Sequence, residues 1–125
     1  GYRKLLELAH SNAPNLRTVI VSPTPLENLG APLPNMNQAN GRLKELTEAL
    51  KGFAAQQNAT FVNGYELMGG DAATTANPPL TINGVHYAEA GYKIWAQTHS
   101  SAGLTTSEIH SGTTGINSQR GRQEG

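Results

Sequence analysis

The sequence contains no cysteine, which excludes disulfides and zinc sites built on thiolate ligands. Charged residues make up only 14% of the chain, and the formal net charge is zero. A chain of this kind gives no electrostatic reason to expect nucleic acid or an anionic membrane as a partner. No apolar run approaches the roughly 20 residues that a membrane helix needs. A chain of 125 residues is long enough for one modest domain with one core and has no room for two. The composition does not identify the compartment.

The sequence also lacks a recognisable nucleophile and a recognisable metal site. Neither Gly-Asp-Ser nor Gly-x-Ser-x-Gly occurs. Ser22 precedes a proline at the end of an expected strand, and the one aspartate, Asp71, lies in a glycine-rich loop where a solvated turn is the expected role. His10, His99 and His110 are scattered without the spacing of metal ligands. We therefore expect no metal and no cofactor.

Five segments have a clear periodicity. Apolar residues spaced by three or four predict helices, and short β-branched runs bounded by turn formers predict strands. A capping box at Asn35 and Gln38 predicts the start of the longest helix, with its apolar face toward the core. The expected order is a helix from Tyr2 to the turn at 12–15, a strand at 16–21, a helix at 35–53, a strand at 59–62 and a helix at 88–98. A single helical turn at 65–68 is a further candidate within the loop after the second strand.

This order predicts an α/β fold with parallel strands joined by a helical crossover. Two strands are too few for an independent parallel sheet, because both faces of such a sheet must be covered. The sequence also begins inside a helical pattern without methionine. We therefore expect residues 1–99 to be part of a larger domain. Residues 100–125, rich in Ser, Thr and Gly, are predicted to be a disordered tail.

The best candidate for chemistry is the stretch from Asn83 to His86. It sets a histidine on a turn, just before an amphipathic segment, with a hydrogen-bonding side chain three residues upstream. This arrangement suits a general base whose ring is held by a partner, with Asn83 accepting a hydrogen bond from the ring nitrogen. The alternative is a plain Asn-Gly turn in which His86 has no function.

Residues 80–92, which read Leu-Thr-Ile-Asn-Gly-Val-His-Tyr-Ala-Glu-Ala-Gly-Tyr, resemble the last sequence block of the SGNH, or GDSL-type, esterases and lipases. In that block an Asp-Gly-x-His stretch precedes a helix with a Gly-Tyr pair. Residues 19–25 and 61–68 resemble the last two core strands of the same family and the segments after them. The resemblance extends over about residues 2–98.

The resemblance implies a flavodoxin-like, three-layer αβα hydrolase, of which this chain is the carboxyl-terminal portion. It implies that a serine attacks a small acyl ester, with a carbohydrate ester as one candidate, and that His86 is the base. Asn83 stands where the family usually has the aspartate of its triad, so an amide replaces a carboxylate. The blocks that carry the family's serine and oxyanion-hole residues do not occur in this sequence. We therefore expect a nucleophile upstream of Gly1 and almost no turnover by this chain alone.

A non-catalytic α/β interaction or structural module is the rival hypothesis. In that case the Asn83–Gly84 pair only makes a turn. For either function, a sheet cut short would leave an unpaired edge, which predicts that the isolated chain self-associates.

Overall fold

The computed structural model describes residues 1–101. Its helices and strands follow the predicted order. They are α1 (Tyr2–Asn12), β1 (Val19–Val21), the 3-10 helix η1 (Asn37–Ala39), α2 (Asn40–Gln56), β2 (Thr60–Val62), α3 (Gly64–Leu67), the 3-10 helix η2 (Gly70–Thr75) and α4 (Glu89–Ser101). The tail predicted for residues 100–125 lies outside the described residues from 102 onward, and α4 includes residues 100 and 101.

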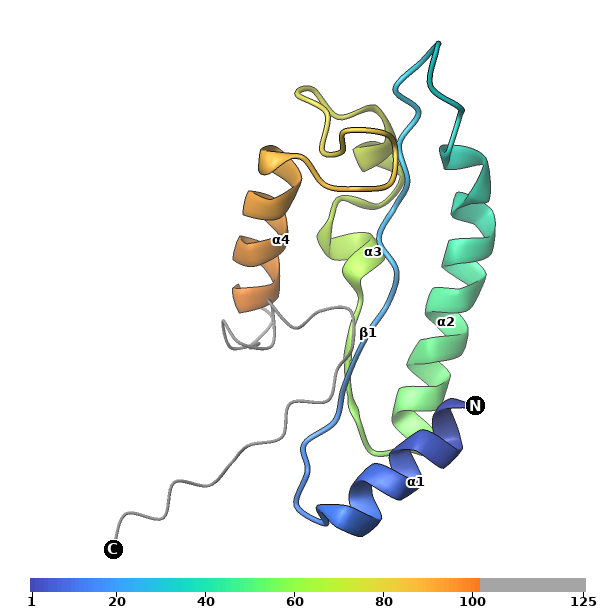
Figure 1. Cartoon of the computed structure of the whole chain (residues 1–125), viewed down its shortest axis with the longest axis vertical. Coiled ribbons are helices and arrows are strands. Elements are labelled where there is room, and N and C mark those ends of the chain that lie inside the picture. Colours follow the sequence, from blue (N-terminus) through green and yellow to red (C-terminus); the bar gives the residue numbers. More distant parts are fainter. Residues whose placement is uncertain (102–125) are drawn as a thin grey trace, which may run out of the picture.

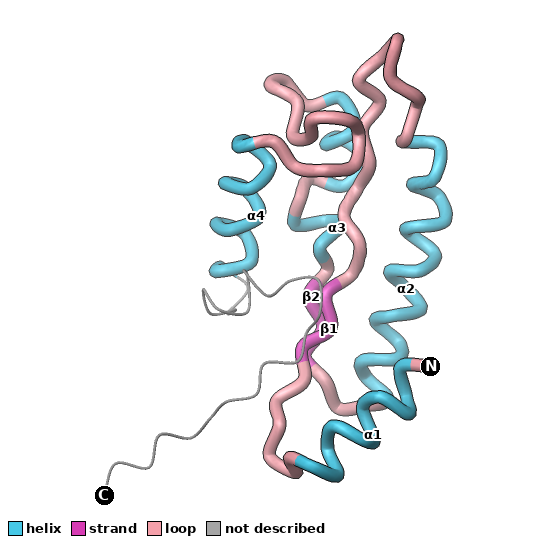
Figure 2. The backbone as a smooth tube through the Cα atoms, in the orientation of Figure 1, coloured by secondary structure: helices cyan, strands magenta, loops and turns pink. Residues whose placement is uncertain are grey.

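β1 and β2 form a two-stranded parallel sheet, which confirms the α/β prediction. Their register pairs Val19 with Thr60 and Val21 with Val62. The connection between them runs through α2, because parallel neighbours need a crossover and cannot be joined by a tight turn. In Figure 1, α2 lies on one side of the strands and α4 on the other. Figure 2 shows how short the two strands are beside the helices and the long loops that continue from them.

The core lies between the strands, α3 and α4. Val62, which is 3% exposed, packs against Val19, Val21 and Trp95. A second cluster forms around Met68, Ala73 and Leu80, and it is completed by Tyr87, Ala90, Ile94 and Trp95. Each large side chain buried here stabilises the fold by about 1.5–3 kcal/mol relative to exposure. Trp95 belongs to both clusters and therefore ties α4 to β2 and to the segment around Leu80.

The start of α2 differs from the prediction. No capping box forms at Asn35 and Gln38, because the Asn35 Oδ1 accepts the N–H of Asn37 two residues on, at 3.1 Å, within its own turn. A 3-10 turn follows, and the α-helix begins only at Asn40.

The apolar face of α2 is covered only in part. Its fully buried residues are Asn40, Thr47 and Ala54, whereas Leu46 is 44% exposed. Tyr2 of α1 packs against Phe53, and the first residues of α1 with Leu46, Ala49, Leu50 and Phe53 line a shallow apolar groove. The prediction that the apolar face of α2 points toward the core therefore holds at some positions, whereas other positions of this face point toward α1 or solvent.

Within residues 1–101 no helix is both long enough and apolar enough to cross a membrane.

Candidate active-site turn

Residues 80–88 lie at the carboxyl ends of the two strands. β1 and β2 both run upward in Figure 1, and the loops that follow them gather at the top, where residues 80–88 cross toward α4. In open α/β sheets, ligands bind outside the carboxyl ends of the strands. The turn that carries Asn83 and His86 is therefore at the edge of the sheet where a binding site is expected.

Backbone hydrogen bonds fold this segment back on itself. Thr81 and Tyr87 form an antiparallel bridge. The Ile82 N–H donates to the His86 carbonyl at 2.8 Å, and the Ala88 N–H donates to the Leu80 carbonyl at 2.8 Å. The tip between these bonds consists of residues 83–86, so both candidate side chains project from one closed turn.

Asn83 and His86 are in direct contact. The Asn83 Oδ1 accepts the backbone N–H of Val85 at 3.1 Å and that of His86 at 2.9 Å. The Nδ1 atom of His86 lies 3.0 Å from Asn83 Nδ2 and 3.3 Å from Asn83 Oδ1. His86 is exposed and Asn83 is half-buried. The exposure of His86 is as expected from the sequence, and its chemical role stays a prediction.

This geometry accommodates two tautomers of the imidazole. If Nδ1 carries the proton, it donates to Asn83 Oδ1 and leaves Nε2 free to accept a proton. If the Asn83 NH₂ group donates to Nδ1, the proton of the ring is on Nε2, which can then only donate. A carboxylate at this position would permit only the first arrangement, because it has no N–H to donate. The amide at position 83 therefore leaves both tautomers of His86 open, whereas a carboxylate would leave one.

Ser22 and Ser11 are not positioned to act as nucleophiles. Ser22 is 4% exposed; its hydroxyl donates to the Pro23 carbonyl at 3.2 Å and accepts the Tyr65 N–H at 3.3 Å. Ser11 is at the end of α1 and donates to the Leu8 carbonyl at 2.8 Å. These contacts agree with the expectation that neither serine serves His86.

The other histidines have structural contacts. His10 Nε2 lies 3.0 Å from the Thr18 hydroxyl. His99 is fully buried, its ring stacks on Trp95, and its Nδ1 lies 2.8 Å from the Trp95 carbonyl. Burial lowers the pKa of His99 below its ordinary value. His110 lies outside the described residues. Within residues 1–101, no group of His, Asp and Glu residues is arranged to hold a metal ion.

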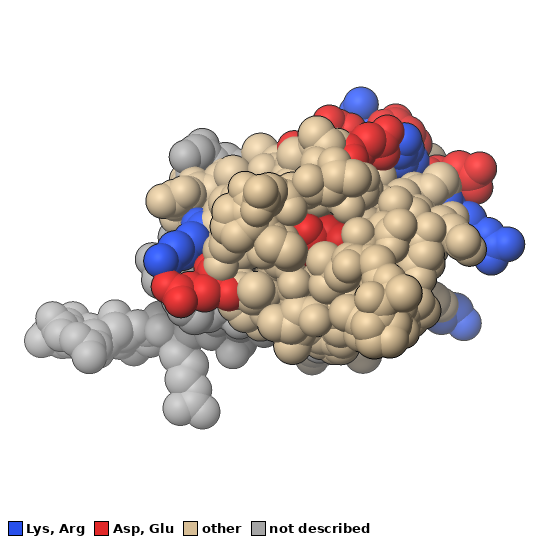
Figure 3. Space-filling view, turned by 90° about the horizontal axis from the view of Figure 1, so that it is seen from above, with Lys and Arg blue, Asp and Glu red and all other residues tan. Residues whose placement is uncertain are grey.

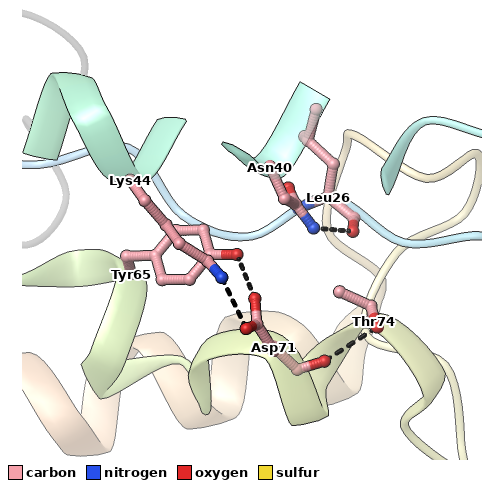
Figure 4. A network of polar contacts seen from close by, with 6 residues as sticks. All are labelled: Leu26, Asn40, Lys44, Tyr65, Asp71 and Thr74. Carbon is pink, nitrogen blue, oxygen red and sulfur yellow. Dashed lines mark hydrogen bonds and ion pairs between the residues drawn. The ribbon is translucent and has the colours of Figure 1, made fainter. Parts of the chain in front are cut away.

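Asp71 belongs to a polar network that connects α2 to η2 (Figure 4). Its carboxylate accepts hydrogen bonds from Lys44 Nζ at 2.5 Å and from the Tyr65 hydroxyl at 2.8 Å. The bond from Lys44 is the main reason that the pKa of Asp71 is below its usual value. Burial, with Asp71 as a second cause, raises the pKa of Tyr65. Because Asp71 and Lys44 are both exposed, this pair contributes little to stability.

The structure also contains a buried carboxyl group that the sequence did not single out. Glu27 is 2% exposed, and its Oε1 accepts the N–H of Leu80 at 2.8 Å. Its backbone N–H donates to the carbonyl of Gly84 at 3.0 Å. Glu27 follows a run of prolines in a segment without periodicity, so no pattern in the sequence predicts its burial.

Comparison with known proteins identifies the family. The model of the GDSL-like lipase/acylhydrolase family matches residues 1–94. No match was found among curated protein sequences. Among solved structures, the chain is similar to the esterase domain of the ORF1 protein from the zebrafish ZfL2-1 retrotransposon, with 24% identity and a TM-score of 0.59.

That similarity covers 83% of this chain and 59% of the zebrafish chain. At this identity it supports the fold alone, and this chain spans less than two thirds of that structure. The family match covers most of the chain, including both strands and the turn with Asn83 and His86. This protein therefore belongs to the GDSL-like lipase/acylhydrolase family.

Proposed function

We propose that this chain supplies the base histidine of a serine-dependent ester hydrolase that cleaves small acyl esters. The observation that carries the proposal is the contact between Asn83 and the ring of His86, on an exposed turn at the carboxyl ends of the strands, in a chain of this family. In this proposal residues 1–99 form the carboxyl-terminal part of the hydrolase domain.

In each half of the proposed reaction one atom, His86 Nε2, takes up a proton and then releases it. It takes the proton of a serine hydroxyl as the serine oxygen attacks the ester carbonyl, and it gives that proton to the departing alcohol. Water then enters in place of the alcohol; the same atom takes a proton from this water as its oxygen attacks the acyl-enzyme, and returns the proton to the serine oxygen as the acid is released. Asn83 holds the ring in place, with Nδ1–H donating to Oδ1 in the active tautomer. The serine and the oxyanion-hole donors come from a segment outside the present sequence.

An uncharged ester fits the surface around the turn. Figure 3 looks down on the face at the carboxyl ends of the strands, and most of that face consists of uncharged residues. The Lys and Arg residues visible in this view lie at its margins, and one group of acidic atoms lies near the middle. Such a surface offers no cluster of cations for an anionic substrate. We include esters of carbohydrates in the proposed substrate class because a sugar ester is neutral and polar.

An assay of the isolated chain tests whether the nucleophilic serine lies outside the present sequence. The chain and its His86→Ala variant are each given p-nitrophenyl acetate, with and without a fluorophosphonate that reacts with activated serines. We expect equal and negligible turnover in all four samples, because the nucleophile is missing. Turnover that requires His86 and is blocked by the fluorophosphonate would contradict the proposal that the serine lies elsewhere.

A second assay tests the role of His86 itself. The coding frame upstream of Gly1 is read, and a protein that includes a Gly-Asp-Ser block is expressed together with its His86→Ala variant. The proposal predicts that the variant loses at least about 10³-fold in kcat, the scale of losses seen when a triad member is removed. Full activity in that variant, or an upstream frame without any hydrolase block, would favour the non-catalytic module.

A further inference from the structure

Glu27 contacts the active-site turn at two points. Its carboxylate accepts the N–H of Leu80, where the segment begins, and its backbone N–H donates to the carbonyl of Gly84, next to Asn83. The two bonds hold Leu80 and Gly84 to a single residue that is 2% exposed. Glu27 is therefore hydrogen-bonded to the turn that carries Asn83 and His86 at two places.

The contact at Gly84 leaves no room for movement toward Glu27. Gly84 has φ of +88°, and a Cβ atom placed on it would lie 2.7 Å from the Glu27 carbonyl oxygen and 2.8 Å from Met36 Cγ. Its N–H donates to the Thr81 hydroxyl at 2.9 Å, so it is also held from inside the turn. Only glycine fits this close approach without strain.

The segment that carries Glu27 is itself fixed to α2. The Asn40 amide makes two hydrogen bonds with the backbone of Leu26, the residue before Glu27. Oδ1 accepts the Leu26 N–H at 2.9 Å, and Nδ2 donates to the Leu26 carbonyl at 2.9 Å, as Figure 4 shows for the latter bond. Asn40 is 6% exposed, so these bonds are shielded from water. A continuous path of bonds thus leads from the crossover helix through Leu26 and Glu27 to the turn.

The second oxygen of the Glu27 carboxylate is buried as well. Glu27 Oε2 has no hydrogen bond to a described residue. Among the described residues, the carboxylate is therefore bonded to the turn through Oε1 alone, at the Leu80 N–H. Buried polar groups are almost always paired, so loss of this bond would leave both the Leu80 N–H and the carboxylate without a partner.

We propose that Glu27 is the positioning residue of the active-site turn. Glu27 acts through Leu80 and Gly84 and does not contact substrate. A role of Glu27 in catalysis rests on the proposed function, but its effect on the conformation of the turn does not.

The experiment therefore reads the turn and not ester hydrolysis. Two variants of the full chain are compared with wild type by NMR. Glu27→Gln keeps an acceptor for Leu80, and Glu27→Met keeps the length of the side chain but removes both oxygens. Glu89→Gln, which changes an exposed carboxylate paired with Lys93, is the matched control. The measurements are the exchange rates of the Ile82, Val85 and His86 amides and the ¹⁵N shifts of the His86 ring.

We expect Glu27→Met to speed exchange of all three amides at least tenfold and to move the His86 ring shifts toward those of a free imidazole. Glu27→Gln should stay within threefold of wild type, because its amide oxygen still accepts the Leu80 N–H. In the Glu89→Gln control, and for the amides of α2 in every folded variant, the rates should not change.

Two results overturn the proposal. One is a folded Glu27→Met variant whose turn amides exchange within threefold of wild type. The other is a Glu27→Gln variant whose turn amides exchange more than tenfold faster than in wild type, which would show, even if Glu27→Met does not fold, that an acceptor for the Leu80 N–H does not hold the turn. Neither result depends on hydrolase activity, so each can be told apart from a failure of the proposed role of His86.

Discussion

Both polar atoms of the Asn83 amide are within reach of Nδ1 of His86, Nδ2 at 3.0 Å and Oδ1 at 3.3 Å. The oxygen is already shared by the N–H groups of Val85 and His86. A carbonyl oxygen has two lone pairs, so a third donor would compete with two good hydrogen bonds. Asn83 therefore holds the ring firmly but does not select the base-competent tautomer as a carboxylate would.

The first prediction concerns this tautomer. Asn83→Asp should shift the neutral His86 ring toward the form with the proton on Nδ1 by at least about tenfold, because a hydrogen bond to a charged group contributes about 1.5–3 kcal/mol. The ¹⁵N shifts of the two ring nitrogens measure the ratio. Asn15→Asp, at an exposed turn after α1, serves as the control and should leave the ratio unchanged. An unchanged ratio in Asn83→Asp would contradict the prediction, because it would mean that even a carboxylate at position 83 does not control the tautomer of His86.

The second prediction separates function from folding at His86. His86→Ala should change the free energy of unfolding by no more than about 0.5 kcal/mol, because His86 is exposed and, within the described part of the chain, its ring is hydrogen-bonded to Asn83 alone. Urea denaturation of the isolated chain measures this change. A loss above about 1.5 kcal/mol would show that His86 is a structural residue of the turn.

The third prediction uses two glycines of opposite character. Gly84→Ala should destabilise the chain by about 1–3 kcal/mol, because Gly84 has a positive φ and a methyl group would meet Glu27 and Met36. Gly52→Ala, within α2, should stabilise it by about 0.5–1 kcal/mol, because nothing lies within 4 Å of the added methyl group and alanine favours helix. The same urea titration measures both. Equal effects would contradict the close approach at Gly84.

The fourth prediction concerns His99 and pH. Its pKa is lowered by burial, so the folded state binds fewer protons at this site than the unfolded state. The contribution of the neutral ring is full above the ordinary value of 6.5 and is lost as the pH falls from there through the lowered pKa. Wild type should therefore lose melting temperature between pH 7 and pH 5 more steeply than His99→Phe, which keeps a ring against Trp95 but does not titrate. If wild type and His99→Phe lose melting temperature equally across this range, then protonation of His99 does not destabilise the folded state.

The fifth prediction is self-association. In the described residues β1 pairs only with β2, so its other edge has no strand beside it. Tyr2 and Leu8 of α1 are also 70% and 62% exposed. The isolated chain should therefore form dimers or larger species as its concentration rises, measured by size-exclusion chromatography with light scattering. Leu8→Lys places a charge on the exposed face of α1. It should not affect dimers that form through the strand edge, and it should weaken dimers that form through α1. A monomer at all concentrations would contradict the prediction.

The sequence by itself determined the kinds of elements and their order. β-branched runs around Val19 and Phe61 and the apolar spacing of α1, α2 and α4 are local signals, and each element formed close to where its pattern placed it. It also identified Asn83 and His86 as neighbours, because a separation of three residues on an Asn-Gly turn brings two side chains together without help from the rest of the chain.

Only the tertiary structure decided what supports that turn. Asn35 was expected to cap a helix and instead bonds within its own turn, while Asn40, inside α2, fixes Leu26. Glu27 lies in a proline-rich loop, and nothing in the local sequence marks it for burial. It is buried because a segment 53 residues further along the chain brings the Leu80 N–H to its carboxylate. Contacts between residues so distant in sequence leave no periodicity behind, since they depend on how the strands, α2 and α4 pack and not on local preference.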